Sequence, residues 1–356
     1  MQSIIPDLGQ MFLVGFEGST IRHDHWIAES IIDECLGGVI LFDKSIDGSR
    51  RNIESSGQLL DLISTLQGFA EIPLFIAIDQ EGGQVSRLKE SDGFPATRSA
   101  GFLSRQPDPA EAAAWMEMMA TTLALHGINL NLAPVVDLDI NPENPIISRY
   151  ERSYGKDVDL VVRYASMFIE AHHRHGVACC LKHFPGHGSS REDSHLGFVD
   201  ITDCWQEREL EPYKRLFAAG IADAVMTAHV IHRGLDPQSL PATLSGNMLN
   251  SLLRRELGFS GLIVSDDLQM KAISKRWNLE EAVQMAVLAG VDLIVIGNNL
   301  ALEKDVAARG IRAIEKLLAD GRIDEERLYA SLERIGALKK KIAGEEAWKN
   351  DRPTTC

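Results

Sequence analysis

The chain has 356 residues, of which 45% are hydrophobic, and a formal net charge of −15 at pH 7. This length and apolar content allow two domains or one large α/β barrel. The acidity excludes nucleic acid and anionic membrane surfaces as partners, because both would repel the chain, and no apolar run approaches the ~20 residues of a membrane-spanning helix.

The N-terminal stretch and the cysteines predict a compartment. The stretch MQSIIPDLGQM has no basic region followed by an apolar run, so we expect no signal peptide. The five cysteines are scattered, odd in number and without C-x-x-C spacing, which predicts neither a disulfide framework nor a zinc knuckle. Both observations indicate a cytoplasmic location.

Eight short apolar runs recur along the chain with helical stretches between them. They are rich in Val, Ile and Leu without alternation, which is typical of strands buried on both faces. The runs are Met11–Gly18, Gly38–Asp43, Pro73–Asp79, Ile128–Asp137, Val177–Lys182, Ala222–His229, Gly261–Asp266 and Val291–Gly297.

Seven of the eight runs, all but the first, end in or next to a polar residue. Strands that alternate with helices and end in polar tips are the pattern of a (β/α)8 TIM barrel, in which all the tips share one rim. We therefore predict a single α/β barrel domain over residues 1–345, with room for one irregular strand and a frayed tail over 346–356; an open doubly wound sheet is the alternative. The tips are Asp43, Asp79, Asp137, Lys182, His229, Asp266 and Asn298.

The intervening helices carry their own boundary signals. Asp108 followed by Pro109 predicts an N-cap and first turn, and Asn278 predicts another N-cap. Gly290 predicts the end of that second helix, and a final amphipathic helix begins near Asp324.

The stretch Leu181 to Gly197, LKHFPGHGSSREDSHLG, gathers more chemistry-bearing side chains than any other. It begins as the end of a buried strand and continues as a glycine- and serine-rich loop. Asp193 and His195 are one residue apart, so in an extended loop their side chains fall on the same side. A carboxylate that holds one ring nitrogen leaves the other to move protons; two unrelated exposed residues are the alternative.

Two further stretches carry carboxylates at strand tips. Asp266 closes an apolar strand and Asp267 follows it, so in an extended chain only one of them should face the barrel mouth. The alternative is that Asp267 caps the next helix while Asp266 only orders the loop. After the third strand, paired glycines in DQEGGQVSR allow a sharp turn through which Asp79 and Arg87 could address one ligand. An acid beside a donating arginine is a common way to hold a sugar, although such a pair can also be structural.

The order of these motifs resembles glycoside hydrolase family 3, in particular its bacterial β-N-acetylglucosaminidases of the peptidoglycan-recycling type. The likeness spans roughly residues 10 to 300, and KHFPGHG followed by D-S-H is its most specific part. Gln84 stands where the family frequently has arginine, which leaves the fine substrate preference open. The matching stretches are DQEGGQVSRL at 79–88, NLAPVVDLD at 131–139, ERSYGKD at 151–157, KHFPGHG at 182–188, DSH at 193–195, VMTAH at 225–229 and LGFSGLIVSDDLQM at 257–270.

The resemblance implies a barrel enzyme that hydrolyses terminal β-linked N-acetylglucosamine in a glycan or muropeptide by a two-step retaining mechanism. It implies Asp266 as the nucleophile and His195, paired with Asp193, as the acid/base, with no metal and no cofactor. The oligomeric state stays open, and a monomer is compatible with the sequence. The residues that the resemblance assigns to sugar binding are Asp79, Arg87, Arg152, Lys182 and His183.

Two other enzyme classes fit the same residues. A β-N-acetylglucosaminide phosphorylase would use phosphate in place of water, which a histidine acid/base tolerates better than a carboxylate. A metal-dependent barrel hydrolase would place a divalent ion among His183, His187, His195 and the nearby carboxylates. Lys182 beside His183 disfavours the metal, because it would compete with a cation.

Overall fold

The computed structural model describes residues 4–193 and 197–344. Eight parallel strands form one sheet in the order β10-β1-β2-β3-β4-β5-β7-β9, and a parallel bridge between Val264 and Leu293 brings its two edges together. This is the predicted (β/α)8 barrel, with one strand in each of the eight apolar runs. The strands are β1 (Phe12–Gly15), β2 (Gly38–Leu41), β3 (Phe75–Ile78), β4 (Leu130–Asn131), β5 (Ala178–Phe184), β7 (Ala224–Thr227), β9 (Leu262–Val264) and β10 (Ile294–Ile296).

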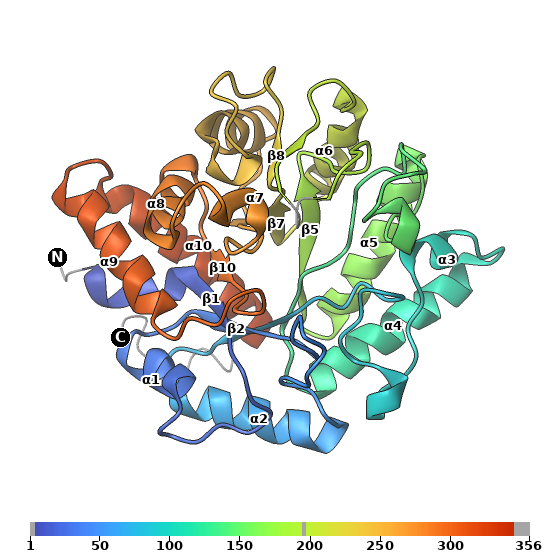
Figure 1. The fold of residues 1–356 in the computed structure, drawn as a ribbon. Helices are drawn as coiled ribbons and strands as arrows, with labels where there is room; N and C mark the ends of the chain where they lie inside the picture. Colours follow the sequence, from blue (N-terminus) through green and yellow to red (C-terminus); the bar gives the residue numbers. More distant parts are fainter. Residues whose placement is uncertain (1–3, 194–196, 345–356) are drawn as a thin grey trace.

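Helices form a ring outside the strands (Figure 1). The predicted N-caps Asp108 and Asn278 are confirmed, since each accepts a backbone N–H of the first turn. The last helix begins beside Asp324, as predicted, and Asp324 caps it in the same way. A π-helix, Asn247–Glu256, follows β7. The α-helices are α1 (Trp26–Asp33), α2 (Ser56–Phe69), α3 (Ala100–Ser104), α4 (Pro109–Leu125), α5 (Val158–Arg174), α6 (Glu211–Ala218), α7 (Lys271–Ser274), α8 (Leu279–Ala289), α9 (Val306–Ala319) and α10 (Glu325–Ala343).

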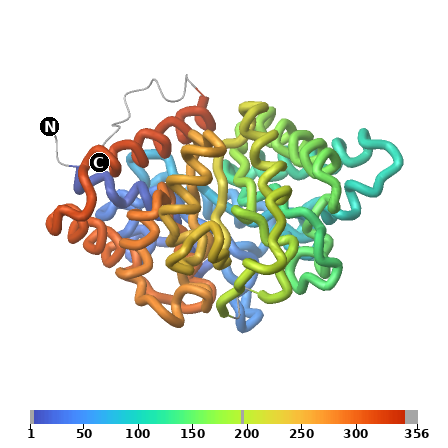
Figure 2. The backbone as a smooth tube through the Cα atoms, turned by 90° about the horizontal axis from the view of Figure 1, so that it is seen from above, coloured from blue at the N-terminus to red at the C-terminus, as the bar shows by residue number. Residues whose placement is uncertain are grey.

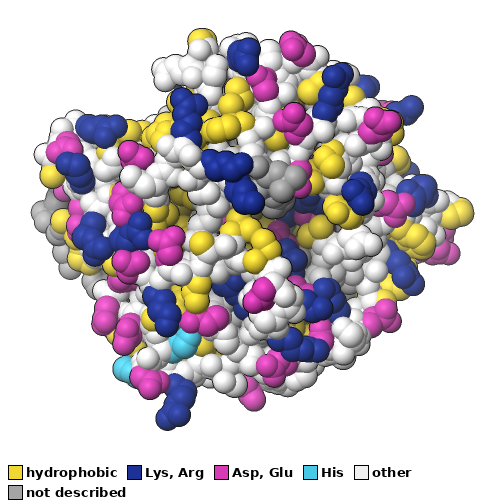
Figure 3. All heavy atoms as spheres, in the orientation of Figure 1, with side chains coloured by type: hydrophobic (Ala, Val, Ile, Leu, Met, Phe, Trp, Pro, Cys, Tyr) yellow, Lys and Arg dark blue, Asp and Glu magenta, His cyan; other side chains and the backbone are white. Residues whose placement is uncertain are grey.

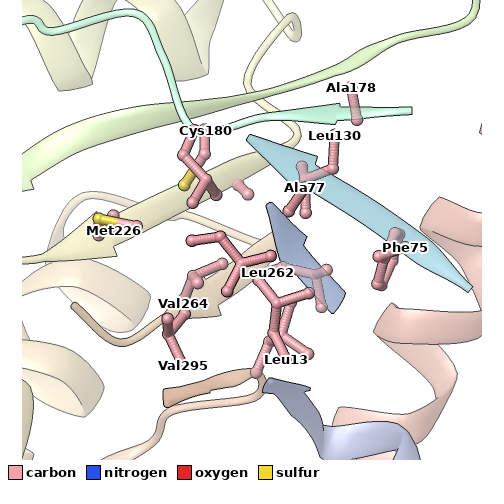
Figure 4. Close-up of a cluster of buried hydrophobic side chains, with 14 of the residues drawn as sticks. Leu13, Phe75, Ala77, Leu130, Ala178, Cys180, Met226, Leu262, Val264 and Val295 are labelled. Carbon is pink, nitrogen blue, oxygen red and sulfur yellow. The ribbon is translucent and has the colours of Figure 1, made fainter. Parts of the chain in front are cut away.

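The barrel interior is a packed apolar core. Side chains from different strands meet inside it (Figure 4), so the strands are buried on both faces, as their lack of alternation predicts. The close-up labels Leu13, Phe75, Ala77, Leu130, Ala178, Cys180, Met226, Leu262, Val264 and Val295.

The two ends of the described chain lie side by side. Figure 2 shows the N-terminal and C-terminal segments adjacent, and α10 packs against the 3-10 helix Ile5–Met11. The neighbouring strands β1 and β10 pair in parallel, which joins the first run to the last. The predicted tail over 346–356 lies outside the described residues. Among the described residues, no helix has the length and apolarity to cross a membrane.

The structure adds two details to the predicted barrel. The fourth run is an irregular strand, for which the prediction left room: β4 covers only Leu130–Asn131, and pairing with the fifth run resumes at a bridge between Val135 and Lys182. A second pair of short parallel strands, β6 (Val199–Asp200) and β8 (Val230–Ile231), was not predicted.

Candidate active site

A cavity of about 220 Å³ opens at the C-terminal ends of the barrel strands. Six of the eight predicted site residues line it, although they come from segments far apart in the sequence. The cavity is therefore one site built by the fold. These six residues are Asp79, Arg87, Arg152, Lys182, His183 and Asp266.

Lys182, which is buried, and Arg152, whose side chain is 10% exposed, lie in the cavity wall and share one carboxylate, that of Glu81. Lys182 Nζ lies 2.8 Å from Asp79 Oδ1 and 2.7 Å from Glu81 Oε1. Arg152 binds Glu81 with two donors, Nε to Oε2 at 2.7 Å and Nη2 to Oε1 at 2.8 Å. Arg87 Nη2 closes the row at 3.4 Å from Asp79 Oδ2. The result is a fixed row of alternating charges that can donate to and accept from neighbouring hydroxyls.

The pairing keeps these groups charged. Burial alone would raise the pKa of Asp79, but Lys182 and Arg87 bring it well below its usual range. Burial would likewise raise the pKa of Glu81, yet Arg152 and Lys182 lower it to about 2. Burial would lower the pKa of Lys182, and the two carboxylates raise it above its usual value. Both carboxylates therefore stay acceptors at neutral pH.

A second cluster fixes His183. Its Nδ1 lies 2.7 Å from Asp137 Oδ2, and its Nε2 lies 3.2 Å from Arg152 Nη2. Because the guanidinium can only donate, Nε2 is the acceptor and Nδ1 carries the proton that Asp137 accepts. Burial would raise the pKa of Asp137, but His183 lowers it. The ring is thus held in one tautomer and one orientation at the cavity.

Lys182 and His183 are consecutive, yet both line the cavity. The register between β5 and β7 shifts between Leu181 and Phe184, and an irregularity of this kind changes which side of the strand a residue faces. The loop that follows is tied down by Asn144, whose Nδ2 donates to the His187 carbonyl at 2.8 Å. Gly188 abuts the Leu138 carbonyl so closely that a Cβ would lie 1.7 Å from that oxygen.

The proposed proton-transfer pair is only partly described. Asp193 is half-buried at the end of this loop, and His195 lies outside the described residues. The distance between the two side chains therefore stays a prediction.

Asp266 follows β9 and lines the cavity, and so does Asp267, which corrects the expectation that only one of them would. Asp267 Oδ1 accepts the N–H groups of Gln269, at 3.0 Å, and Gly297, at 3.1 Å. The chain bends here into a turn before α7 and is not extended, so the alternation of an extended strand does not apply. Asp267 also caps this turn rather than the helix.

Sequence reasoning missed Glu81, Asp137 and His187 as site residues. Glu81 lies two residues from Asp79 in the same motif, and that spacing is the signal that could have identified it. Asp137 was a predicted strand tip without an assigned role. His187 lines the cavity, and burial lowers its pKa to about 4, so it is neutral at pH 7.

The surface over this end of the barrel is electrostatically mixed. Figure 3 shows the face presented in Figure 1, on which basic and acidic side chains are interspersed. A single-sign surface of the kind that binds a polyanion is therefore not seen on this face.

Comparison with known proteins adds independent information. The family model "Glycosyl hydrolase family 3 N terminal domain" matches residues 4–338. A β-hexosaminidase of Tolumonas auensis is 39% identical over 273 residues, covering 75% of this chain and 77% of the relative.

Solved structures show the same architecture. A glycoside hydrolase family 3 β-N-acetylglucosaminidase from Paenibacillus sp. matches with a TM-score of 0.87 and 36% identity over 96% of this chain. This chain spans only 63% of that protein. A β-N-acetylhexosaminidase from Beutenbergia cavernae matches with a TM-score of 0.84 and 28% identity, covering 95% of this chain and 99% of its own.

Proposed function

The chain belongs to glycosyl hydrolase family 3, and on that premise we propose that it is a retaining exo-β-N-acetylhexosaminidase with Asp266 as its nucleophile. β-N-acetylhexosaminidase activity is supported by relatives that carry this activity in their names. The retaining mechanism and the residue roles are our proposals from the site.

The observation that carries the proposal is one shared cavity. Asp266 lines it together with the charged row of Asp79, Lys182, Glu81 and Arg152. At about 220 Å³ the cavity is smaller than the ~300–1,000 Å³ of typical ligand pockets. That size suits a single terminal sugar and an exo mode of cleavage.

The mechanism follows from the chemistry of these groups. The Asp266 carboxylate attacks C1 of the sugar and forms a covalent glycosyl-enzyme while the leaving oxygen takes a proton. We assign that proton to His195, oriented by Asp193. In the second step the same imidazole removes a proton from water, whose oxygen bonds to C1 as the bond between C1 and Asp266 breaks. The charged row meanwhile holds the hydroxyls at the non-reducing end of the sugar, so that C1 is presented to Asp266.

A product analysis tests the proposal. With an aryl β-N-acetylglucosaminide, we expect β-N-acetylglucosamine as the first product by proton NMR, and much slower turnover of the matched aryl β-glucoside. A first product of α configuration would contradict the retaining mechanism. N-acetylglucosamine 1-phosphate formed only with added phosphate would establish the phosphorylase, and loss of turnover after exhaustive chelation would favour the metal-dependent hydrolase.

Two finer assignments stay predictions. A muropeptide substrate from peptidoglycan recycling follows from the family resemblance, and comparing turnover of a muropeptide with that of chitobiose would test it. A cytoplasmic location likewise stays a prediction, which fractionation of cells that express the chain would test.

A further inference from the structure

His229 is a strand-tip residue without a role in the mechanism above. It follows β7 and its side chain is fully buried. A buried histidine costs free energy unless both ring nitrogens are satisfied. The partners of this ring therefore indicate what it does.

The two ring nitrogens bridge β7 to the segment that carries Asp266. His229 Nε2 lies 2.9 Å from the Asp267 carbonyl oxygen, and Nδ1 lies 2.8 Å from Thr243 Oγ1. A carbonyl can only accept, so Nε2 carries the proton. Thr243 Oγ1 in turn lies 2.7 Å from Thr227 Oγ1 and 3.2 Å from the Ala228 carbonyl oxygen, which fixes the hydroxyl that holds Nδ1. The ring is therefore anchored at Thr243 and donates to Asp267.

Asp267 in turn holds the proposed nucleophile. Its backbone N–H donates to Asp266 Oδ1 at 2.8 Å. Its side chain is clamped by the N–H groups of Gln269 and Gly297, as described above. A Cβ at Gly297 would come within 2.5 Å of Asp267 Oδ2, so only glycine permits this approach. The same residue thus meets His229 with its carbonyl and Asp266 with its N–H.

We infer that His229 is a positioning residue for the nucleophile: through the backbone of Asp267 it fixes the direction in which the Asp266 carboxylate faces C1. The inference rests on the proposed function, because it takes Asp266 as the nucleophile. His229 itself does not touch the sugar in this role. It acts by removing the freedom of a turn that would otherwise let the carboxylate rotate.

Two conservative variants separate the two nitrogens. In His229→Gln the amide nitrogen can replace Nε2 and still donate to the Asp267 carbonyl. In His229→Asn the shorter amide can replace only Nδ1, and in His229→Ala both contacts are lost. The quantity measured is the pre-steady-state rate at which the sugar is transferred from an activated N-acetylglucosaminide to the enzyme.

We expect His229→Ala and His229→Asn to lower this transfer rate by about 10²-fold, since a misplacement of ~1 Å costs that much, while His229→Gln stays within about tenfold of wild type. KM should change little, because the charged row is untouched. The acid limb of kcat/KM should move to higher pH in the Ala and Asn variants, because the Asp266 carboxylate loses part of a hydrogen bond that favours its charged form.

His126→Ala is the matched control for a merely structural loss. His126 is also buried and makes two contacts, Nε2 to Ser56 Oγ at 2.8 Å and Nδ1 to the Thr122 carbonyl at 2.7 Å, at the end of α4. It should lose thermal stability and keep the transfer rate. The inference is wrong if His229→Gln transfers the sugar as slowly as His229→Ala. It is also wrong if all three His229 variants lose stability but keep the wild-type transfer rate, as His126→Ala should. If wild type itself forms no glycosyl-enzyme on Asp266, the proposed function fails instead.

Discussion

Glu81 joins Lys182 and Arg152 and is itself only 4% exposed in its side chain. In Glu81→Gln the volume is kept and the charge is lost, so Lys182 and Arg152 face each other without their shared anion. We expect a loss of about 3–5 kcal/mol in the free energy of unfolding, as when one partner of a buried pair is removed, and a higher KM. Denaturant titration and steady-state kinetics measure both.

Glu117→Gln controls for the same substitution at the surface. Glu117 pairs with Arg174 at 2.5 Å, but its side chain is 39% exposed. Surface pairs contribute at most about 1 kcal/mol. Equal losses in the two variants would show that the Glu81 network is not a buried one.

His195 gives a prediction that depends on the leaving group. His195→Ala should lower turnover of a poor leaving group by about 10²–10⁴, because the departing oxygen lacks its proton. The loss should be smaller with an activated leaving group such as dinitrophenolate, which departs without one. A loss independent of leaving-group acidity would remove His195 from the role of acid.

At the scale of elements, the loop after β5 depends on close backbone contact. In Gly188→Ala the new Cβ would meet the Leu138 carbonyl at 1.7 Å, so the loop must shift. A displacement of ~1 Å near a site costs about 10²-fold in rate, and we expect a fall of that order in kcat.

Gly57→Ala is the control for this glycine substitution. Gly57 lies in α2 with open space around its Cβ position, so alanine should stabilise the helix by about 0.5–1 kcal/mol and leave kcat unchanged. Full activity in Gly188→Ala would show that the loop position does not matter for turnover.

The same loop rests on a buried acid that precedes α6. Gly186 approaches Glu209 so closely that a Cβ would lie 2.7 Å from the Glu209 Cβ. Burial raises the pKa of the Glu209 carboxyl from 4.5 to about 7, although its contact with Ser189 lowers it. Between pH 4.5 and 7 the folded state thus binds more protons than the unfolded state, so this group's contribution to stability falls as the pH rises.

Glu209→Gln removes that titration. Relative to the variant, wild type should lose about 3 kcal/mol of unfolding free energy between pH 4.5 and 7, the equivalent of a shift of about 2.5 pKa units. Denaturant unfolding of both proteins at several pH values gives the difference. Parallel curves across this range would mean that Glu209 is not a buried acid with a raised pKa.

At the scale of the whole molecule, the barrel could be predicted because eight runs buried on both faces leave little choice of architecture. The strand tips could be predicted for the same reason, and Asp79, Lys182 and Asp266 do meet in one cavity. The motif spacing could have identified Glu81, but its bridge between Lys182 and Arg152 could not be predicted, because Arg152 lies about 70 residues away along the chain. The turn at Asp267 could not be predicted either, because it depends on the hydrogen bond that the Gly297 N–H donates to the Asp267 carboxylate.

The most direct measurement of the central claim is mass spectrometry of the enzyme trapped with a fluorinated N-acetylglucosaminide. We predict a stoichiometric gain of one sugar on the peptide that contains Asp266, no such gain in Asp266→Ala, and a turnover in that variant lower by about 10⁴ or more. A label on another residue, or Asp266→Ala activity near that of wild type, would contradict the account.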